Sequence, residues 1–415
     1  MFFMITISTI KKGILPKDSK SAQILSAPNY DEFQNDLEVF NIVKEGRGKI
    51  LTVTMPHCDV QNELEIFEDG SQRALSKACE NSKELFSSEF FEQQEDFICV
   101  YEISDPKRSN IRQIGLTCMA KTSEIRTDKT PNGTIIRNEG IKEYKAKGRA
   151  DLISRTGFFL ESVNLAIEDT AQSVEKALLS YADSRDFDFS AVDEDNNNHK
   201  VWVVKEKDVQ EKFIDLFQNE PCAYVADGNH RSAAAAMLNY DSFLTVLFPL
   251  KTMGLDPYNR LVKAEGVSEE EIIEKLKENF EVKPQETNKI WQPYESKKIS
   301  LYFSGKGYTL TPKSGLFDEK NAVESIDADI VHKNIFHKVL GIENITDERL
   351  TFVGGNKDHN YLKEKVDSKE FDFAVLLSPV SLKEFADVCK QNGKMPAKST
   401  WFTPKIRSGL WLAKA

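Results

Sequence analysis

The segment that most constrains the fold is Ala223–Ala236, in which a short apolar run meets a turn and then a run of small residues. Residues 223–226 (Ala-Tyr-Val-Ala) have the length and composition of a buried strand, and Asp227-Gly228 is typical of a turn. Ala233–Ala236 lack side-chain bulk, so a helix that starts after the turn can pack closely on the sheet behind it. The segment therefore predicts a strand–turn–helix inside an α/β structure.

Short apolar runs alternate with amphipathic segments on both sides of this unit. Gly157–Ile167 and Phe243–Phe248 indicate buried strands, whereas Thr170–Tyr181 and Val209–Phe217 have helical spacing. We expect an α+β fold. Turn formers at Thr127–Gly133 and near Asp256-Pro257 predict three domains, namely an N-terminal α/β region of unknown role (residues 1–130), a mixed α/β core (131–255) and a C-terminal α/β domain (256–415).

The charge balance limits the partners of the chain. Its 415 residues contain 55 Lys+Arg and 66 Asp+Glu, which gives a net charge of −11. A negative field disfavours nucleic acid and anionic membrane surfaces, but it permits one local basic pocket for a phosphate. Apolar runs such as Phe243–Leu250 are far shorter than the roughly 20 residues that span a bilayer. We expect neither nucleic acid nor membrane as a partner.

The N-terminus and the cysteines indicate a cytoplasmic protein. Met1–Ile7 places its apolar residues before Lys11 and Lys12, the reverse of a secretory signal, so we expect a mature cytoplasmic start. The six cysteines are scattered and form no C-x-x-C pair, so reduced thiols are expected. His57-Cys58 next to Asp59 could suggest a Cys/His nucleophile, but adjacent residues in a chain rarely meet in the required geometry, so this interpretation is disfavoured.

The strand-to-helix turn is the strongest candidate for chemistry. Such a turn presents backbone N–H groups and the positive end of a helix dipole at one point, where an anion binds well. His230 and Arg231 add donors, and Asp227 is placed to hold Mg²⁺ or a polar group. The alternative is an ordinary turn before an N-capped helix. The predicted phosphate or nucleotide site consists of Asp227, Gly228, Asn229, His230, Arg231 and Ser232.

Two further segments carry candidate residues. Glu139 follows the predicted strand Thr134–Arg137 and is a candidate general base, although a lone Glu among 66 acidic residues is usually a solvated surface group. Met395–Gly409 gathers cations and hydroxyls around Trp401 and Phe402, an arrangement that suits an anion shielded from water. The alternative is a terminal loop whose aromatic side chains are anchored in a core. Walker A, G-x-G-x-x-G, H-E-x-x-H and G-x-S-x-G motifs are absent.

Several of these motifs together resemble a known family. Ala226–Ala235, Pro257–Lys263, Phe352–Gly355 and Met395–Gly409 occur in the order found in domain-of-unknown-function family 1015, and the first block resembles it through Ala27–Asp31. That family is similar to the archaeal free serine kinases, which use a nucleotide to phosphorylate L-serine and have a ParB/sulfiredoxin-like fold. The resemblance implies such a core here.

The same resemblance implies roles for single residues. In the kinases an Asp-Gly-His-His-Arg turn cradles phosphates, and Asp227, Gly228, His230 and Arg231 occupy it here, with Asn229 in place of the first His. The catalytic Glu of a His-Glu pair corresponds to Glu139, with Asn138 in place of His. The substrate-side Lys-Thr-Thr segment corresponds to Lys398, Ser399 and Thr400, and Trp401 follows it. The related sulfiredoxins need a cysteine in the turn. The nearest one here, Cys222, lies five residues before Asp227, so sulfiredoxin chemistry is disfavoured.

These observations lead to a small-molecule phosphotransferase that resembles a free serine kinase. ATP or ADP would be the co-substrate with Mg²⁺ at Asp227, Glu139 and His230 would be catalytic, and Lys398, Ser399, Thr400 and Trp401 would bind the small hydroxylated metabolite. The alternative is a non-catalytic regulatory protein that binds a nucleotide or phosphometabolite, which Asn138 and Asn229 favour. A purely structural scaffold is a third hypothesis, and DNA binding of the ParB type is disfavoured by the charge. The acceptor, the choice between ATP and ADP and the oligomeric state stay open.

Overall fold

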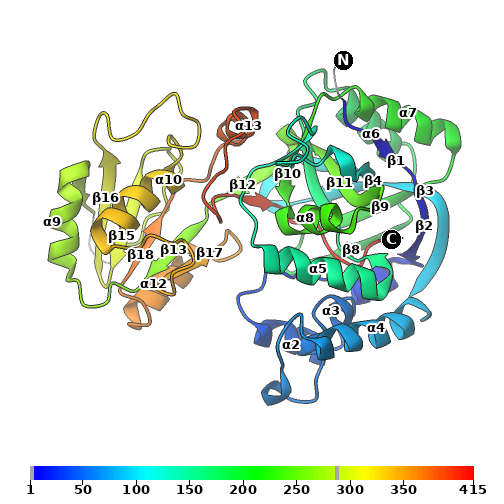
Figure 1. Cartoon of the computed structure of the whole chain (residues 1–415), viewed down its shortest axis with the longest axis horizontal. Coiled ribbons are helices and arrows are strands. Elements are labelled where there is room, and N and C mark those ends of the chain that lie inside the picture. Colours follow the sequence, from blue (N-terminus) through cyan, green and yellow to red (C-terminus); the bar gives the residue numbers. More distant parts are fainter. Residues whose placement is uncertain (1–3, 286–288) are drawn as a thin grey trace. The chain divides into compact units, whose positions relative to one another are not determined.

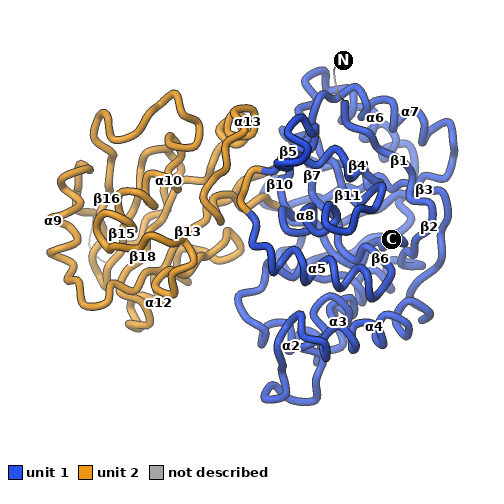
Figure 2. The backbone as a smooth tube through the Cα atoms, viewed as in Figure 1, with its two compact units in different colours: residues 1–137, 141–253, 404–415 blue, residues 138–140, 254–403 orange. Residues whose placement is uncertain are grey.

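The structure is a computed structural model that describes residues 4–285 and 289–415 (Figure 1). Residues 1–3 belong to the segment on which the cytoplasmic prediction rests, and they lie outside the described residues. The chain forms two compact units (Figure 2). Unit 1 contains residues 1–137, 141–253 and 404–415, and unit 2 contains residues 138–140 and 254–403.

Unit 1 is built on a 12-stranded sheet. Its central strands are rich in Val, Ile, Leu and Phe and are almost fully buried, as expected for a sheet covered on both faces. The spatial order along the sheet is β5 (Ile135–Arg137), β10 (Ala223–Asp227), β7 (Val163–Ile167), β11 (Ser242–Pro249), β4 (Arg112–Lys121), β3 (Phe91–Ser104), β2 (Ile10–Pro16), β20 (Leu412–Lys414) and β6 (Phe158–Phe159). Off this path, β1 (Ile7–Ser8) pairs with β4, and β9 (Asn198–Val204) joins β8 (Phe189–Val192) to β3.

The strand that precedes the turn has a parallel neighbour. β5 pairs parallel to β10 with Arg137 opposite Val225, so both strands end at the same edge of the sheet. β7 pairs antiparallel to β10 and parallel to β11, with an irregularity in register between Val225 and Asp227. The segments that follow β5 and β10 therefore both begin at the edge of the sheet where Asp227 lies.

The helices of unit 1 cover this sheet. Ala233–Ala235 of α8 (Asn229–Leu238) are buried, because small side chains let the helix approach its neighbours closely. α8 packs on α5 (Glu143–Thr156), and α5 packs on α4 (Gln72–Phe86), as Figure 1 shows. The other helices of this unit are α1 (Ser19–Leu25), α2 (Asp36–Lys44), α3 (Leu51–Thr54), α6 (Ser173–Asp183) and α7 (Lys207–Gln218).

Unit 2 has its own sheet and core. Its six strands lie in the order β14 (Phe280–Pro284), β16 (Lys306–Pro312), β15 (Ile299–Phe303), β18 (Phe373–Leu376), β13 (Asn259–Val262) and β17 (Leu350–Val353). β12 (Gly254–Asp256) and β19 (Trp401–Thr403) form a separate antiparallel pair. The helices are α9 (Glu269–Asn279), which starts with a Ser268–Glu271 capping box, α10 (Asp327–Val331), α11 (Lys338–Leu340), α12 (His359–Asp367) and α13 (Leu382–Lys390).

The α+β prediction is confirmed, and so is the strand–turn–helix at Asp227. The unit boundary after Met253 lies close to the boundary predicted at residue 255. No unit boundary lies at residue 130, because β4 of the N-terminal region pairs with β11 of the predicted core. The three-domain division with its C-terminal domain at 256–415 stays a prediction, and residues 404–415 lie in unit 1.

Two further expectations concern the cysteines and the membrane. All six cysteines are free thiols, as the scattered spacing predicts. Among the residues that the structure describes, no helix has the length and apolar character needed to cross a membrane.

Candidate functional site

The turn after β10 has the local geometry of an anion site. Gly228 is the N-cap of α8 and has a φ of +93°, which glycine adopts without steric cost. A Cβ at this position would also lie 3.0 Å from Nε of Arg231. Because glycine has no capping side chain, the positive end of the α8 dipole carries no side-chain cap. This is the arrangement that favours a phosphate or carboxylate at a helix N-terminus.

Arg231 is enclosed beneath this turn. Its side chain is only 4% exposed, and its Nη1 donates to the carbonyl oxygen of Ser162 and to Oδ1 of Asn29, the latter at 3.4 Å. Nη2 lies 3.4 Å from Oδ1 of Asp227 and 3.9 Å from Oδ1 of Asp31. Burial would lower the pKa of Arg231, but the two carboxylates outweigh it and raise that pKa. Arg231 therefore fixes Asp227 to the N-terminal segment, and its contact with a phosphate stays a prediction.

The N-terminal and C-terminal motifs meet beside the turn. Asn29 is 1% exposed, and its Nδ2 donates to Oε1 of Glu32 at 2.9 Å and to the carbonyl oxygen of Ile406 at 3.0 Å. The hydroxyl of Ser408 donates to Oδ1 of Asn29 at 3.0 Å, and Ala27 forms a β-bridge with Ser408. Segments almost 380 residues apart thus build one wall of the site.

Lys405 is the second cation at the turn. Its Nζ donates to Oδ2 of Asp227 at 2.9 Å, and the side chains of Lys405 and Asp227 are 16% and 13% exposed. Burial would lower the pKa of Lys405, but the charges of Asp227, Glu32 and Asp31 outweigh it and raise that pKa. The ammonium group therefore stays charged, and it is more accessible to a ligand than the guanidinium of Arg231.

Carboxylates outnumber cations around the turn. Burial raises the pKa of Glu32 to about 7, and burial also raises the pKa of Glu161. A phosphate would add more negative charge, and carboxylate oxygens are the ligands that Mg²⁺ prefers. The residues present therefore fit a divalent cation bound together with a phosphate. We define the turn cluster as Asp31, Glu32, Glu161, Asp227, Arg231 and Lys405.

The other predicted turn residues lie on α8. Nε2 of the half-buried His230 accepts a hydrogen bond from the backbone N–H of Lys142 at 3.0 Å, so this nitrogen carries no proton and the ring proton lies on Nδ1. Ser232 is fully buried, and its hydroxyl donates to the carbonyl oxygen of Asn229. Asn229 is itself buried. Ser232 therefore stabilises the first turn of the helix with its side chain.

Glu139 lies in unit 2, although both of its flanks in the chain lie in unit 1. Met395 donates its backbone N–H to the carbonyl oxygen of Asn138 at 2.8 Å, and Glu139 forms a parallel β-bridge with Met395. Asn138 is fully buried, and Glu139 is half-buried. Glu139 therefore lies beside the start of Met395–Gly409, which the sequence had singled out separately.

The segment around Trp401 is anchored in the core of unit 2. The indole is 5% exposed and packs edge-on against Tyr258, with ring centroids 5.5 Å apart. A Cβ at Gly354 would lie 2.3 Å from the indole ring, which explains the glycine in Phe352–Gly355. This supports the alternative in which the aromatic side chains anchor a loop. We define the Trp401 cluster as Tyr258, Arg260, Phe352, Gly354 and Trp401.

Lys398, Ser399 and Thr400 precede this anchor. Nζ of Lys398 lies 5.5 Å from the centre of the Tyr258 ring, and its backbone has a φ of +62°. Ser399 is 5% exposed and its hydroxyl donates to the carbonyl oxygen of Pro396. Thr400 is half-buried. Their predicted contact with a substrate stays a prediction.

An open cavity of about 490 Å³ lies in unit 2 next to Met395. His332, one of its lining residues, begins the π-helical turn His332–His337, a rare feature that is frequent at functional sites. Burial lowers the pKa of His332, so the imidazole is neutral near pH 7. The residues that line the cavity are Asp329, His332, Glu343, Asn344, Ile345, Lys394, Met395, Pro396 and Ala397.

Sequence reasoning missed several members of the turn cluster. Glu161 and Glu32 have no local signal among 66 acidic residues. Asp31 ends the motif Ala27–Asp31, and Lys405 lies inside Met395–Gly409, so both were inside segments that the motifs marked. Pairing these two motifs with each other would have indicated the cluster.

Comparison with known proteins places the chain in a family. The family described as "Protein of unknown function (DUF1015)" matches residues 10–329. The chain belongs to this family. The match includes the N-terminal region, which the motifs connect to the family only through Ala27–Asp31, and it ends before Met395–Gly409. No curated protein matches the chain.

Solved structures resemble the chain only at low scores. A free serine kinase in complex with AMP is 13% identical, with a TM-score of 0.36 over 67% of this chain and 89% of the kinase. SbnI with a C-terminal truncation from Staphylococcus aureus is 11% identical, with a TM-score of 0.40 over 71% of this chain and 85% of that one. A conserved hypothetical protein from Pyrococcus furiosus is 12% identical, with a TM-score of 0.36 over 67% and 92%.

Proposed function

We propose that the chain is a phosphotransferase that uses ATP or ADP to phosphorylate a hydroxyl group of a small, serine-like metabolite. The observation that carries this proposal is the turn cluster at the start of α8. There a glycine N-cap and the carboxylate of Asp227 meet the cation of Lys405, which the C-terminal segment supplies. Phosphoryl transfer depends mainly on positioning and charge stabilisation, which such a small set of groups supplies.

The phosphate would bind at the N-terminus of α8. Lys405 donates to Asp227 at the start of α8, and its ammonium group would place a positive charge beside a phosphate oxygen there. Nδ1 of His230 would supply a further donor. Arg231 would act indirectly in this arrangement, because it holds Asp227 in place from below.

Mg²⁺ fits the excess of carboxylates in the turn cluster. Asp227 and Glu32 would hold the ion, because both carboxylates lie close enough to Lys405 to raise its pKa. When bound, Mg²⁺ would neutralise charge on the phosphates. The ordinary pKa of a glutamate is 4.5 and that of Glu32 is raised to about 7, so binding at neutral pH would displace a partly retained proton.

Glu139 would accept the proton of the acceptor hydroxyl. The resemblance to the kinases supports this role, because their catalytic Glu corresponds to Glu139. A general base at this position would contribute roughly 10²–10⁴-fold to the rate. Lys398, Ser399 and Thr400 would bind the acceptor, and Trp401 would anchor their segment.

The test is phosphoserine formation from L-serine and Mg²⁺ with ATP, ADP or inorganic pyrophosphate, measured by mass spectrometry. Pyrophosphate lacks the nucleoside and so isolates the nucleotide part of the proposal. We expect Lys405→Met to lower the rate at least about tenfold, since a charged hydrogen bond contributes roughly 1.5–3 kcal/mol. Lys383→Met is the matched control, because Lys383 is 84% exposed and pairs with Asp387 in unit 2. Glu139→Gln should lower turnover further and leave donor binding intact. Turnover that Lys405→Met leaves unchanged, or no turnover with any donor, would contradict the proposal.

One observation favours a binding protein without phosphotransfer. Asn138 stands where the resembling kinases carry histidine, and it is fully buried with its carbonyl oxygen bonded to Met395. Thermal shift separates the two functions. Stabilisation by nucleotide that Lys405→Met abolishes and Glu139→Gln preserves, with no product from the wild-type protein, would select the binding protein.

A further inference from the structure

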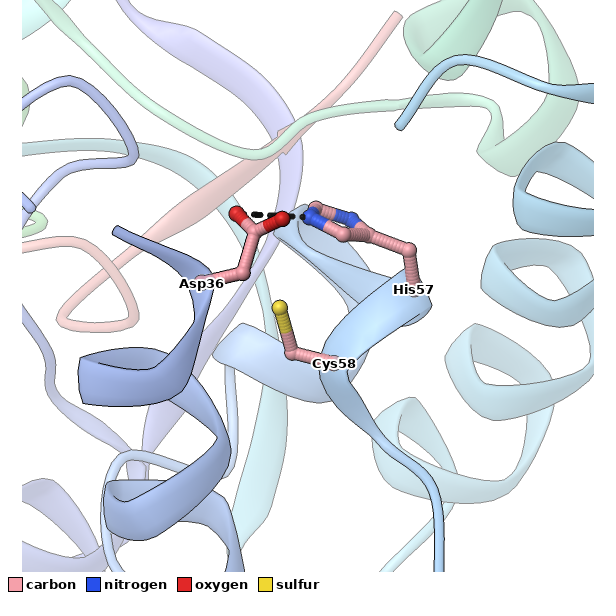
Figure 3. Close-up of side chains that lie close together, drawn as sticks. All are labelled: Asp36, His57 and Cys58. Atoms are coloured by element: carbon pink, nitrogen blue, oxygen red, sulfur yellow. Dashed lines mark hydrogen bonds and ion pairs between the residues drawn. The ribbon is translucent and has the colours of Figure 1, made fainter. Parts of the chain in front are cut away.

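His57 and Cys58 meet a third polar side chain in unit 1 (Figure 3). Both lie in the 3₁₀ turn Pro56–Cys58, and Asp36 is the first residue of α2. Nε2 of His57 lies 3.2 Å from Oδ1 of Asp36. One ligand atom from each of the three residues lies within 4.8 Å of the other two. Figure 3 shows the carboxylate, the imidazole and the thiol directed toward a common region.

We propose that Asp36, His57 and Cys58 bind a divalent transition-metal ion, with Zn²⁺ as the best match. An oxygen, a nitrogen and a sulfur donor are the ligand types that Zn²⁺ takes in proteins. The Zn–N, Zn–O and Zn–S bond lengths together with tetrahedral angles place the ligand atoms about 3.3–3.6 Å apart. The separation between His57 and Asp36 already meets this requirement. The thiol needs to move closer by about 1.5 Å at most, which follows from the bound of 4.8 Å.

The other ring nitrogen of His57 faces an outer carboxylate. Nδ1 lies 3.5 Å from Oδ1 of Asp69, and Oδ2 of Asp69 accepts from Nη2 of Arg149 at 3.2 Å. When Nε2 binds a metal, the ring proton lies on Nδ1 and points toward Asp69. Carboxylate–histidine–metal arrangements of this kind orient the imidazole and make it a better ligand. This second contact is independent of the three ligand atoms and points to the same ion.

Burial around the cluster suits a bound ion. The side chain of His57 is fully buried, and Cys58 belongs to the apolar core formed with Val39 and Ile50. Asp36 is 52% exposed, so the ion would enter from its side and a water would complete the coordination. The apolar surroundings of the thiol strengthen the attraction between the ion and its ligands.

A bound ion would connect two segments of unit 1. It would join the start of α2 to the turn Pro56–Cys58, about 20 residues later in the chain. Binding to the folded state alone stabilises a protein by about 2.7 kcal/mol when the free ion is at 100 times its Kd. The inference does not depend on the proposed phosphotransferase function.

Titration of the full-length, EDTA-treated protein with Co²⁺ tests the site. Co²⁺ reports a thiolate ligand through its near-ultraviolet charge-transfer absorption, and Zn²⁺ should then displace it. We expect saturation at one equivalent, and loss of the charge-transfer band in Cys58→Ser. Cys79→Ser is the matched control, since Cys79 is a half-buried cysteine of α4 outside the cluster, and its band should match the wild type.

Two further variants keep the proposal falsifiable if Cys58→Ser does not fold. Asp36→Asn changes an exposed side chain, and it should weaken Co²⁺ binding and remove the rise in Tm that Zn²⁺ produces. Asp69→Asn should preserve the charge-transfer band and weaken affinity about 10–100-fold through the imidazole. A wild-type protein without a saturable Co²⁺ band, or a band and a Zn²⁺-dependent Tm that Asp36→Asn leaves unchanged, would overturn the proposal.

Discussion

The turn cluster of unit 1 and the Trp401 cluster of unit 2 both consist of residues from the family motifs, but they are held together by different forces. In the turn cluster, charged side chains satisfy one another. Arg231 and Lys405 share Asp227 between them, and Asp31 faces Arg231 from the N-terminal motif. Ion pairing explains the identities of Asp227, Arg231 and Lys405, since each of these charges lies beside a partner of opposite sign.

In the Trp401 cluster, shape explains the residue types. Gly354 leaves the space that the indole of Trp401 fills, and Tyr258 meets that indole edge-on. Arg260 is the exception, because it is 1% exposed and burial lowers its pKa to about 10. The comparison shows that residues of one family's motifs can be required for different reasons. Charged motif residues mark the candidate chemistry, whereas glycines and aromatic residues mark the packing that supports it.

The largest effect is expected when the buried charge of the turn cluster is removed. Arg231→Met leaves Asp227 and Asp31 without their common partner inside the protein. Breaking a buried ion pair in this way costs about 3–5 kcal/mol, so the free energy of unfolding in urea should fall by that amount. Arg47→Met is the control, because Arg47 is 54% exposed and its pair with Glu45 contributes about 0–1 kcal/mol. A loss below about 1 kcal/mol for Arg231→Met would show that the turn cluster is held together by packing, like the Trp401 cluster.

A pH-dependent effect is expected from Glu32. Burial raises its pKa from 4.5 to about 7, so between these values the folded state keeps a proton that the unfolded state has lost. Stability from this group therefore falls as the pH rises from about 4.5 to about 7. Glu32→Gln removes the titration, and it should stabilise the protein relative to wild type at about pH 8 by up to about 3 kcal/mol, with almost no difference at about pH 4.

The measurement is urea unfolding of both proteins at the two pH values, because the difference between them cancels every other titrating group. Equal stability at both pH values would show that Glu32 is solvated. The charges of the turn cluster would then be less tightly coupled than its contacts imply.

The sequence predicted local structure well wherever the signal was local. The apolar run before Asp227, the glycine after it and the small residues of Ala233–Ala236 together specify β10, the turn and α8. The capping box at Ser268–Glu271 was visible for the same reason, since its two residues lie three positions apart. In each case the residues that interact are close in the chain.

What the sequence could not predict depends on distant pairing. Lys405 reaches Asp227 because the C-terminal strand β20 returns to unit 1 and pairs with β2. No local sequence pattern predicts the pairing of β20 with β2. For the same reason Arg231 was expected to point toward a ligand, and only its partners Ser162 and Asp31 reveal that it is enclosed. A charged residue in a motif indicates a binding or catalytic site. Whether its side chain faces a ligand or is held by an internal ion pair depends on residues that are distant in the sequence.

The smallest effect is expected in the Trp401 cluster, and it tests whether packing alone explains its glycine. A Cβ at Gly354 would lie 2.3 Å from the Trp401 ring, so Gly354→Ala forces the indole or the backbone to shift. Overpacking of this kind costs about 1–3 kcal/mol. Gly148→Ala in α5 is the control, because nothing lies within 4 Å of its new Cβ, and it should stabilise the protein by about 0.5–1 kcal/mol through helix propensity.

A double variant makes this prediction specific. Trp401→Leu removes the ring that Gly354→Ala would contact, so in its presence the alanine should cost almost nothing. The coupling between the two changes, measured by urea unfolding, should then equal most of the cost of Gly354→Ala alone. Additive costs would contradict a direct steric contact. Gly354 would then be required for another reason, and the difference between a charged cluster and a packed cluster would rest on the turn cluster alone.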